Sequence, residues 1–293
     1  MKKKTVRTVS IIILIVVTMS AFLTSCGNSG KDAMTVEYCR IVNKVVPADA
    51  EYNATTVIGG KKFVDLCLYM NNLNGDDLDD VSGSVEIDGK KTELEYCKES
   101  RGSTSIEKGP VTAGEVTRIH LVAPISEEDA EKEGMTVKFT VSGKEYSADV
   151  EKEITEGSDP LGNKTQLNVG DKIDVNGIVS IEVIESKLAE NGRLGKKFRM
   201  TYTGYDTVLK IKNISGADID PLYISSINFY YLKDGKLVRG SERAELNSKL
   251  PSSDEIKEFE NGDEYYVHLL GYKPDDYFRF NLFGNLYYIA PTE

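Results

Sequence analysis

The stretch that decides the fold is Val64-Asp65-Leu66-Cys67-Leu68-Tyr69-Met70, in which aliphatic residues alternate with other residues. A period of two sends successive side chains to opposite faces of a β-strand. The alternation recurs in residues 209–212. Other short runs are rich in the β-branched and aromatic residues that favour strands, at 119–122, 137–141, 178–184 and 227–232. The sequence therefore predicts an all-β chain.

Turn signals separate these runs. Asp88-Gly89 and Asp234-Gly235 lie between apolar segments and predict tight hairpin turns. Short strands with regularly spaced turns are typical of an antiparallel β-sandwich. Two short helices are also expected, at residues 126–133, where Ser126 is a suitable N-cap, and at residues 241–246.

The chain contains an internal repeat. Residues 70–79 align without a gap to residues 211–220, and three further blocks match in the same order. The identical positions are Asn72, Gly75, Asp77 and Asp79 with Asn213, Gly216, Asp218 and Asp220; Asp88-Gly89-Lys90 with Asp234-Gly235-Lys236; Gly114 and His120 with Gly262 and His268; and Phe139, Gly143 and Tyr146 with Phe280, Gly284 and Tyr287. We interpret the body as two copies of one domain, each near the common size for a single core.

The domain boundaries follow from this repeat. Residues 1–25 are a signal peptide and residues 26–33 a flexible tether. The first domain covers 34–153 and the second 165–293, and the turn-forming residues 154–164 link them.

The second copy resembles a family of known domains in three motifs. They are the opening Val169-Gly170-Asp171-Lys172-Ile173 with Asn176-Gly177-Ile178, the strand and turn at residues 210–216, and the turn Gly262-Asp263. These motifs resemble the immunoglobulin-like domains of Gram-positive lipoproteins, which are similar to the mycobacterial immunoprotective extracellular protein. The first copy lacks the Val-Gly-Asp opening. The resemblance implies two tandem immunoglobulin-like sandwiches and an extracellular setting, and it implies no particular activity.

The N-terminus predicts export and lipid anchoring. Basic residues at 2–4 and Arg7 precede an apolar segment too short for a spanning helix. Leu23-Thr24-Ser25-Cys26 resembles a lipobox, which implies cleavage between Ser25 and Cys26 and a thioether-linked diacylglycerol on Cys26, with palmitate-type chains. Several acyl chains hold a protein on a membrane far better than one. We therefore expect a lipoprotein on the outer side of the cell membrane.

Charge and cysteine content narrow the partners. The formal charge is −11, and removing the four basic residues of the signal segment leaves a body of −15. Such a body is repelled by phosphate backbones, so nucleic-acid binding is not expected. Cys39, Cys67 and Cys97 remain in the body as free thiols or with one disulfide among them. No cofactor is predicted.

Three sets of polar residues are candidates for function. The two histidines, His120 and His268, lie mid-strand between apolar neighbours, and we favour a structural role because no catalytic partners are evident. An acidic loop could bind Ca²⁺ through oxygen ligands or be a solvated turn; its residues are Asn72, Asn74, Asp76 and Asp79. Outward tyrosines could form a binding face for peptide or sugar, or simply suit strands; they are Tyr230, Tyr265 and Tyr288.

The functional expectation is a lipid-anchored, non-enzymatic binding, adhesion or accessory module of the cell envelope, with an extracellular protein or glycan as ligand. The alternative is an enzyme or enzyme accessory acting on envelope polymers. It requires a convergent polar cluster, for example between the domains near His120 or His268. A third hypothesis is a spacer without a specific ligand. No catalytic residue is assigned.

Overall fold

The all-β class is confirmed by the structure. The computed structural model describes residues 33–43, 60–73, 75–101, 106–151, 164–189, 193–194, 198–199, 204–225, 227–233, 236–239, 243–246, 258–272, 277–290 and 292. Strands dominate these residues, and the helices are the short α1 (Glu127–Ala130) and α2 (Pro221–Ser225). Within the described ranges, no helix is long and apolar enough to cross a membrane.

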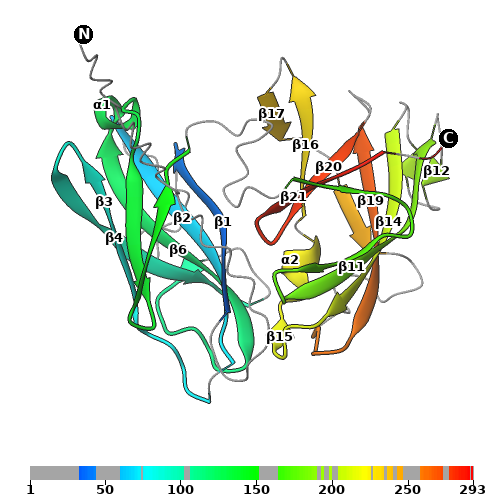
Figure 1. Ribbon diagram of the computed structural model, residues 1–293, viewed down its shortest axis with the longest axis horizontal. Helices are drawn as coiled ribbons and strands as arrows, with labels where there is room; N and C mark the ends of the chain where they lie inside the picture. The colour runs from blue at the N-terminus through cyan, green and yellow to red at the C-terminus, as the bar shows by residue number, and fades with distance from the viewer. Residues whose placement is uncertain are drawn as a thin grey trace, which may run out of the picture.

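The N-terminal unit, residues 33–151, is a rolled antiparallel sheet in the order β1-β2-β6-β4-β3-β7-β8, with β5 beside β4 (Figure 1). Its strands are β1 (Ala33–Val42), β2 (Lys61–Asn71), β3 (Val81–Ile87), β4 (Lys90–Glu99), β5 (Ile106–Glu107), β6 (Glu115–Ser126), β7 (Thr136–Val141) and β8 (Lys144–Asp149). Val64, Leu66, Leu68 and Met70 all point into its core, as the alternation predicts.

The C-terminal unit, residues 164–292, has two five-stranded sheets around a second core. The front sheet has the order β10-β11-β14-β19-β18 and the back sheet β17-β16-β20-β21-β9. The strands are β9 (Lys164–Leu167), β10 (Lys172–Val175), β11 (Val179–Ala189), β14 (Gly204–Asn213), β15 (Asp218–Ile219), β16 (Asn228–Lys233), β17 (Lys236–Arg239), β18 (Arg243–Leu246), β19 (Glu264–Tyr272), β20 (Phe278–Leu282) and β21 (Asn285–Ile289), with β12 (Arg193–Leu194) and β13 (Phe198–Arg199) as a separate pair.

The hairpin turns have the geometry that their residues favour. Asp88 and Gly89 have φ angles of 51° and 77°, so both central residues are left-handed, as a type I′ turn requires. This confirms the turn predicted at Asp88-Gly89. The other predicted turn, Asp234-Gly235, lies outside the described residues.

One predicted helix is correct and one is wrong. Ser126 caps α1, and its hydroxyl accepts a hydrogen bond from the Asp129 amide at 2.9 Å. Residues 243–246, in contrast, form strand β18, which pairs with β19. A single helical turn is marginal by itself, whereas the edge of β19 supplies a complete ladder of hydrogen bonds.

The two units share the same local architecture around the repeated asparagines. Asn72 Nδ2 donates to the carbonyls of Asp76 (3.1 Å) and Val111 (3.0 Å). Asn213 Nδ2 donates to Ala217 (2.8 Å) and Phe259 (2.6 Å). The strands that pair with β2 and β14 also carry a bulge at equivalent positions, between Val36 and Tyr38 in β1 and between Val183 and Glu185 in β11.

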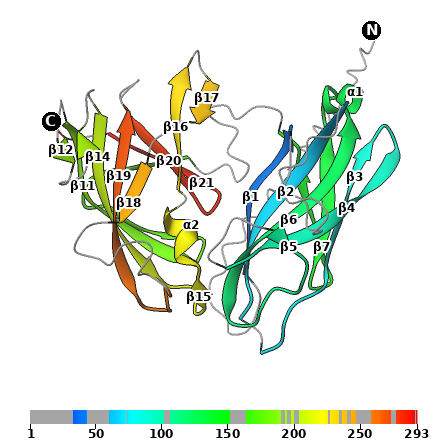
Figure 2. The ribbon, with the colours of Figure 1, turned by 180° about the vertical axis from the view of Figure 1, so that it is seen from behind.

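The units pack directly on each other. Figures 1 and 2 show β1, β2 and β6 on the side of the N-terminal unit that faces the C-terminal unit. β15 pairs in parallel with β6, and Asn71 Nδ2 donates to the Ser215 carbonyl at 2.9 Å. Tyr69 of β2 belongs to the core cluster of the C-terminal unit, with its ring 5.4 Å from Tyr223 and 4.8 Å from Phe283. The outer face of the first sheet is therefore an interface between the units.

Candidate functional site

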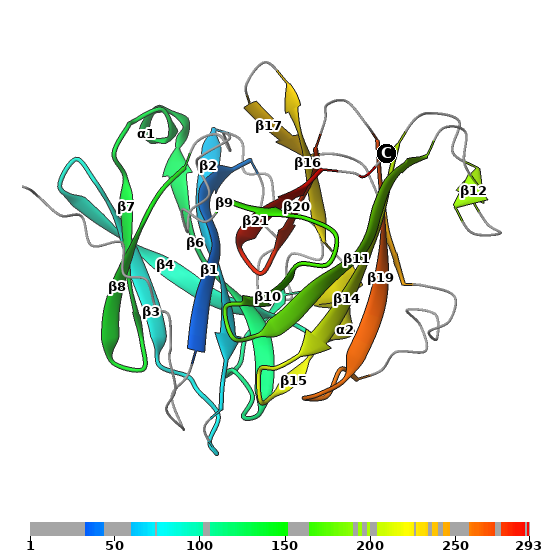
Figure 3. The same cartoon turned by 45° about the vertical axis from the view of Figure 1, so that its right-hand side comes forward.

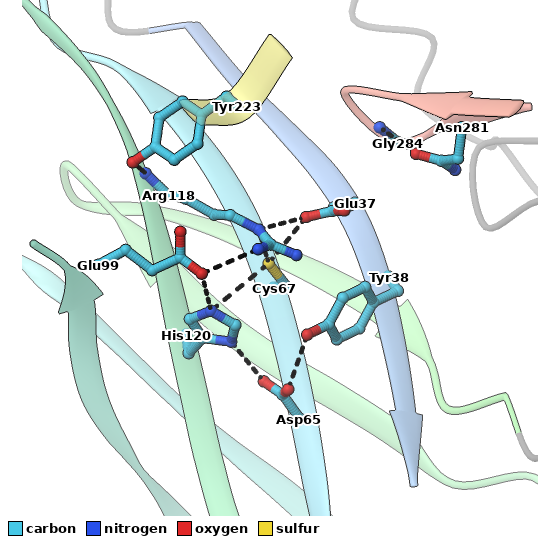
Figure 4. Close-up of polar contacts among 10 residues, drawn as sticks. All are labelled: Glu37, Tyr38, Asp65, Cys67, Glu99, Arg118, His120, Tyr223, Asn281 and Gly284. Atoms are coloured by element: carbon cyan, nitrogen blue, oxygen red, sulfur yellow. Dashed lines mark hydrogen bonds and ion pairs between the residues drawn. The ribbon is translucent and has the colours of Figure 1, made fainter. Parts of the chain in front are cut away.

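A cluster of charged and polar side chains is buried in this interface (Figure 4). We call it the interface cluster; it consists of Glu37, Tyr38, Asp65, Cys67, Glu99, Arg118 and His120. The side chains come from four neighbouring strands, β1, β2, β6 and β4. Sheet register aligns them, because Tyr38 is opposite Cys67, Cys67 is opposite His120, and His120 is opposite Cys97.

The strand alternation explains how these residues reach the interface. Leu66 and Leu68 face the core, so Asp65, Cys67 and Tyr69 face outward from the same strand. All three are nevertheless buried, because the C-terminal unit covers this face. Glu37 lies at the bulge of β1, where the extra residue redirects a side chain, and is also buried.

Arg118 connects the carboxylates of the cluster. Its Nε donates to Glu37 Oε2 at 2.5 Å, and its Nη1 donates to Glu99 Oε1 at 2.8 Å. Both carboxylate side chains are only 6% exposed, and Arg118 is 17% exposed. Removing one partner of such a buried pair leaves an uncompensated charge, which is strongly destabilising.

His120 is held between two carboxylates. Its Nδ1 lies 3.0 Å from Asp65 Oδ1, and its Nε2 lies 3.5 Å from Glu99 Oε1. Burial opposes the charged imidazolium, but the neighbouring Cys67 and then Asp65 raise the pKa of His120 well above its ordinary value. Burial likewise opposes ionisation of Asp65, yet His120 and the Tyr38 hydroxyl, which donates to Asp65 Oδ2 at 2.9 Å, lower the pKa of Asp65. The pair is therefore ionic at neutral pH.

Cys67, His120 and Asp65 have the connectivity of a nucleophile, a base and an orienting acid. Cys67 Sγ lies 3.9 Å from His120 Nε2. The thiol also donates to Glu37 Oε2 at 3.2 Å. Burial raises the pKa of Cys67, which favours the protonated thiol. A nucleophilic thiol has to be deprotonated, which the burial of Cys67 opposes.

The C-terminal unit seals the cluster at two points. The Tyr223 hydroxyl accepts a hydrogen bond from the Arg118 amide at 3.0 Å. The turn between β20 and β21 approaches β1 at Gly284, as Figures 3 and 4 show. A Cβ on Gly284 would overlap the Val36 carbonyl oxygen and lie 3.0 Å from Glu37 Cα. Only glycine fits at this contact.

The second predicted histidine occupies the equivalent place in the other unit. His268 pairs with Asp206, with Nδ1 and Oδ1 4.0 Å apart, on the outer face of the front sheet. Its side chain is 30% exposed, whereas that of His120 is 8% exposed. Tyr266 occupies the position equivalent to Arg118, and Ile184 the position equivalent to Glu37; both are exposed. Among the residues whose side chains are described, the ion network is therefore found in the first unit alone.

One of the predicted calcium ligands, Asn72, has other contacts. Asn72 is fully buried and its amide holds two backbone carbonyls, while Asp76 and Asp79 are exposed. Asn74 lies outside the described residues. Among the residues that are described, no three acidic, cysteine or histidine side chains gather as a metal site.

The predicted tyrosine face is divided between two sheets. Tyr230 and Tyr288 flank Arg279 in the register of the back sheet, so these three side chains share a face. Tyr265 lies on the front sheet, packs against the core, and donates from its hydroxyl to the Glu258 carbonyl at 3.0 Å.

The cysteines of the body are free thiols. Cys39, Cys67 and Cys97 are all buried and unpaired. Burial raises the pKa of Cys97 to about 12. The predicted cleavage and lipidation residues, Ser25 and Cys26, lie outside the described residues.

Sequence reasoning identified His120 but missed Glu37, Arg118 and Glu99. The sequence did contain a signal for this cluster, because outward positions of the predicted strands carry ionisable residues. Comparison with known proteins adds no assignment, because no family model, no curated protein and no solved structure matches the chain.

Proposed function

We propose that this protein is a lipid-anchored component of the cell envelope, and that its body is a non-enzymatic binding, adhesion or accessory module of two tandem immunoglobulin-like β-sandwiches. The repeated asparagine contacts and the matching bulges support the tandem repeat. The lipobox-like Leu23-Thr24-Ser25-Cys26 supports the anchor. The expected location is the outer side of the cell membrane.

The observation that carries the proposal is the sealed interface cluster. Arg118, Glu37 and Glu99 form buried ion pairs, and Gly284 closes the edge of the contact. These ion pairs lie within the N-terminal unit, and the arrangement of the two units is favoured by the contacts of Tyr223 with Arg118, Gly284 with Val36 and Asn71 with Ser215. Two sandwiches fixed in this way form a rigid platform, which suits binding because less entropy is lost on docking.

The enzyme alternative rests on the Cys67, His120 and Asp65 arrangement. Its thiol would need both deprotonation and access to substrate. Cys67 is completely buried, and burial raises its pKa. This favours a structural role for the cluster and a binding role for the outer surfaces.

The anchor is tested by metabolic labelling with palmitate in a bacterial host. Wild-type protein should incorporate the label and fractionate with membranes. A Cys26→Ala variant should lose the label, and a Cys97→Ala variant, which changes a cysteine of the body, should keep it. Label retained by the Cys26→Ala variant would refute lipidation at this residue.

The non-enzymatic assignment is tested with purified envelope polymers. Intact protein should release no soluble fragments from peptidoglycan. Release of fragments that is abolished by Cys67→Ala, but not by Cys97→Ala, would establish the enzyme alternative instead.

A further inference from the structure

The two ends of the N-terminal unit lie at different distances along the chain from Cys26. β1 begins at Ala33, which is opposite Asn71 in the last position of β2. The chain therefore enters the body at this end. The other end of β2, Lys61, is opposite Ser126, which caps α1. Helix α1 thus lies a full strand length away from the point of entry.

Loops of both units gather where the chain enters. Asn71 Nδ2 donates to the Ser215 carbonyl at 2.9 Å, and the Asp218 amide donates to the Gly114 carbonyl at 2.9 Å. We call this place the loop end; its described residues are 72–73, 75–80, 109–115, 214–218 and 260–263. We call the opposite place the α1 end; it consists of residues 61–62 and 126–131. Figures 1 and 2 show α1 and β15, which marks the loop end, at opposite ends of the molecule.

The covalent chain limits how far the loop end can stand from a bilayer that holds Cys26. Seven residue steps (33 minus 26) join Cys26 to Ala33, and in any conformation they span at most about 25 Å. β2 has 11 residues, which span about 34 Å at the rise of a strand. A body with its α1 end on the bilayer places Ala33 about 34 Å or more above the lipid, which is beyond the reach of the chain. The inverted orientation is therefore excluded.

Charge decides between an upright body and one that lies flat. The body carries a formal charge of −15, because the −11 of the chain includes four basic residues of the signal segment. Both ends carry exposed acidic residues, such as Asp76 and Asp80 at the loop end and Glu127 and Glu128 at the α1 end. Repulsion by an anionic lipid surface extends over about 10 Å at 0.1 M salt. A flat body brings both ends into this range, so anionic headgroups favour the upright orientation.

We propose that the loop end faces the lipid bilayer and that the α1 end is the surface presented to external partners. The inference rests on the proposed function, because the lipid on Cys26 makes the bilayer the neighbour of the loop end. It assigns the end of the binding module that is open to a ligand. A ligand that approaches from outside meets α1 and the start of β2 before it meets the loops.

Energy transfer from the protein to a labelled lipid tests the orientation. Full-length lipidated protein is inserted into vesicles of phosphatidylcholine and anionic phosphatidylglycerol that contain a rhodamine-labelled lipid. Fluorescein maleimide is attached to Asp76→Cys at the loop end or to Glu128→Cys at the α1 end, two exposed acidic positions. The native cysteines of the body are buried, so wild type treated with the reagent is the blank. Transfer from position 76 should be at least about twofold stronger, because the two ends are about 34 Å apart along β2.

A longer tether supplies the matched control. Insertion of about twenty Gly and Ser residues after Gly30 extends the reach of the chain to about 90 Å, more than twice the span of β2. Transfer from position 76 should then fall toward that from position 128. A difference that persists with the long tether shows that chain length does not orient the body, and it overturns the inference.

The outcomes separate this inference from the proposed function. Equal transfer from the two positions, stronger transfer from position 128, or no transfer from either overturns the orientation, while palmitate labelling of Cys26 still supports the anchored module. Absence of the palmitate label refutes the anchor itself. Adding Cys26→Ala should abolish transfer from both positions, and transfer that remains shows that the body binds lipid without the anchor and overturns the inference. A thermal melt of each variant establishes that it is folded before labelling.

Discussion

Gly284→Ala should destabilise the protein much more than the same change at the equivalent turn of the other unit, Gly143→Ala. Both glycines are left-handed, with φ angles of +82° and +71°. An alanine in that region costs about 1–2 kcal/mol at either site. Only Gly284 faces a neighbour, because its Cβ would overlap the Val36 carbonyl, whereas nothing lies within 4 Å of a Cβ on Gly143. Overpacking of this kind costs about 1–3 kcal/mol more.

The expected losses in the free energy of unfolding are therefore about 2–5 kcal/mol for Gly284→Ala and about 1–2 kcal/mol for Gly143→Ala. Urea denaturation followed by circular dichroism and tyrosine fluorescence measures both, since the chain contains no tryptophan. Thermal midpoints should fall by about 2–4 °C for each kcal/mol.

A second measurement reports on the interface itself. Native Cys67 should react very slowly with a thiol reagent, because it is fully buried under the C-terminal unit. Gly284→Ala should accelerate its labelling, and Gly143→Ala should not. Equal destabilisation by the two substitutions, together with unchanged labelling of Cys67, would refute the contact between Gly284 and β1.

Three further outcomes follow from the buried charges. Because the pKa of His120 is raised in the folded state, its stabilising contribution is complete below about pH 6.5 and is lost as the pH rises through the folded-state pKa. Wild type should therefore lose stability relative to His120→Gln as the pH rises through that value. Stability curves of the two proteins that stay parallel, in denaturation at several pH values, would contradict this. Asp65→Asn should cost about 3–5 kcal/mol at pH 7, because it removes the nearer of the two carboxylates beside the buried His120 and leaves only Glu99, at 3.5 Å. Asp206→Asn should instead leave the melting temperature unchanged or raise it, since burial raises the pKa of Asp206. A larger loss from Asp206→Asn would contradict our interpretation of the two pairs. Arg118→Met should cost about 3–5 kcal/mol in urea denaturation, because it leaves buried Glu37 without a cation and Glu99 with only His120, at 3.5 Å. A loss below about 1 kcal/mol, typical of exposed pairs, would show that the pairs are solvated.

Local physics accounts for what could be predicted from the sequence. Alternation in residues 64–70 predicted which side chains of β2 enter the core, because the pleat of a strand fixes that division. Asp88-Gly89 predicted a hairpin turn because these residues tolerate positive φ angles. The helical interpretation of residues 243–246 was wrong because pairing with β19, which is distant in sequence, outweighs weak local propensity.

The candidate site illustrates the limit of such reasoning. His120 could be selected by residue type, but Glu37 and Arg118, 81 residues apart, gave no local sign that they would pair. Their contact requires the register between β1, β2 and β6, which long-range pairing sets.

The sequence by itself determined an all-β chain, the inward and outward positions of its strands, and the left-handed turns. Only the tertiary structure decided that the outward face of β1, β2 and β6 is buried and that its charges pair with one another. The reason is physical: alternation assigns a side chain to one face of a sheet, but solvent or a second unit covers that face according to contacts between residues such as Val36 and Gly284, which lie at opposite ends of the body.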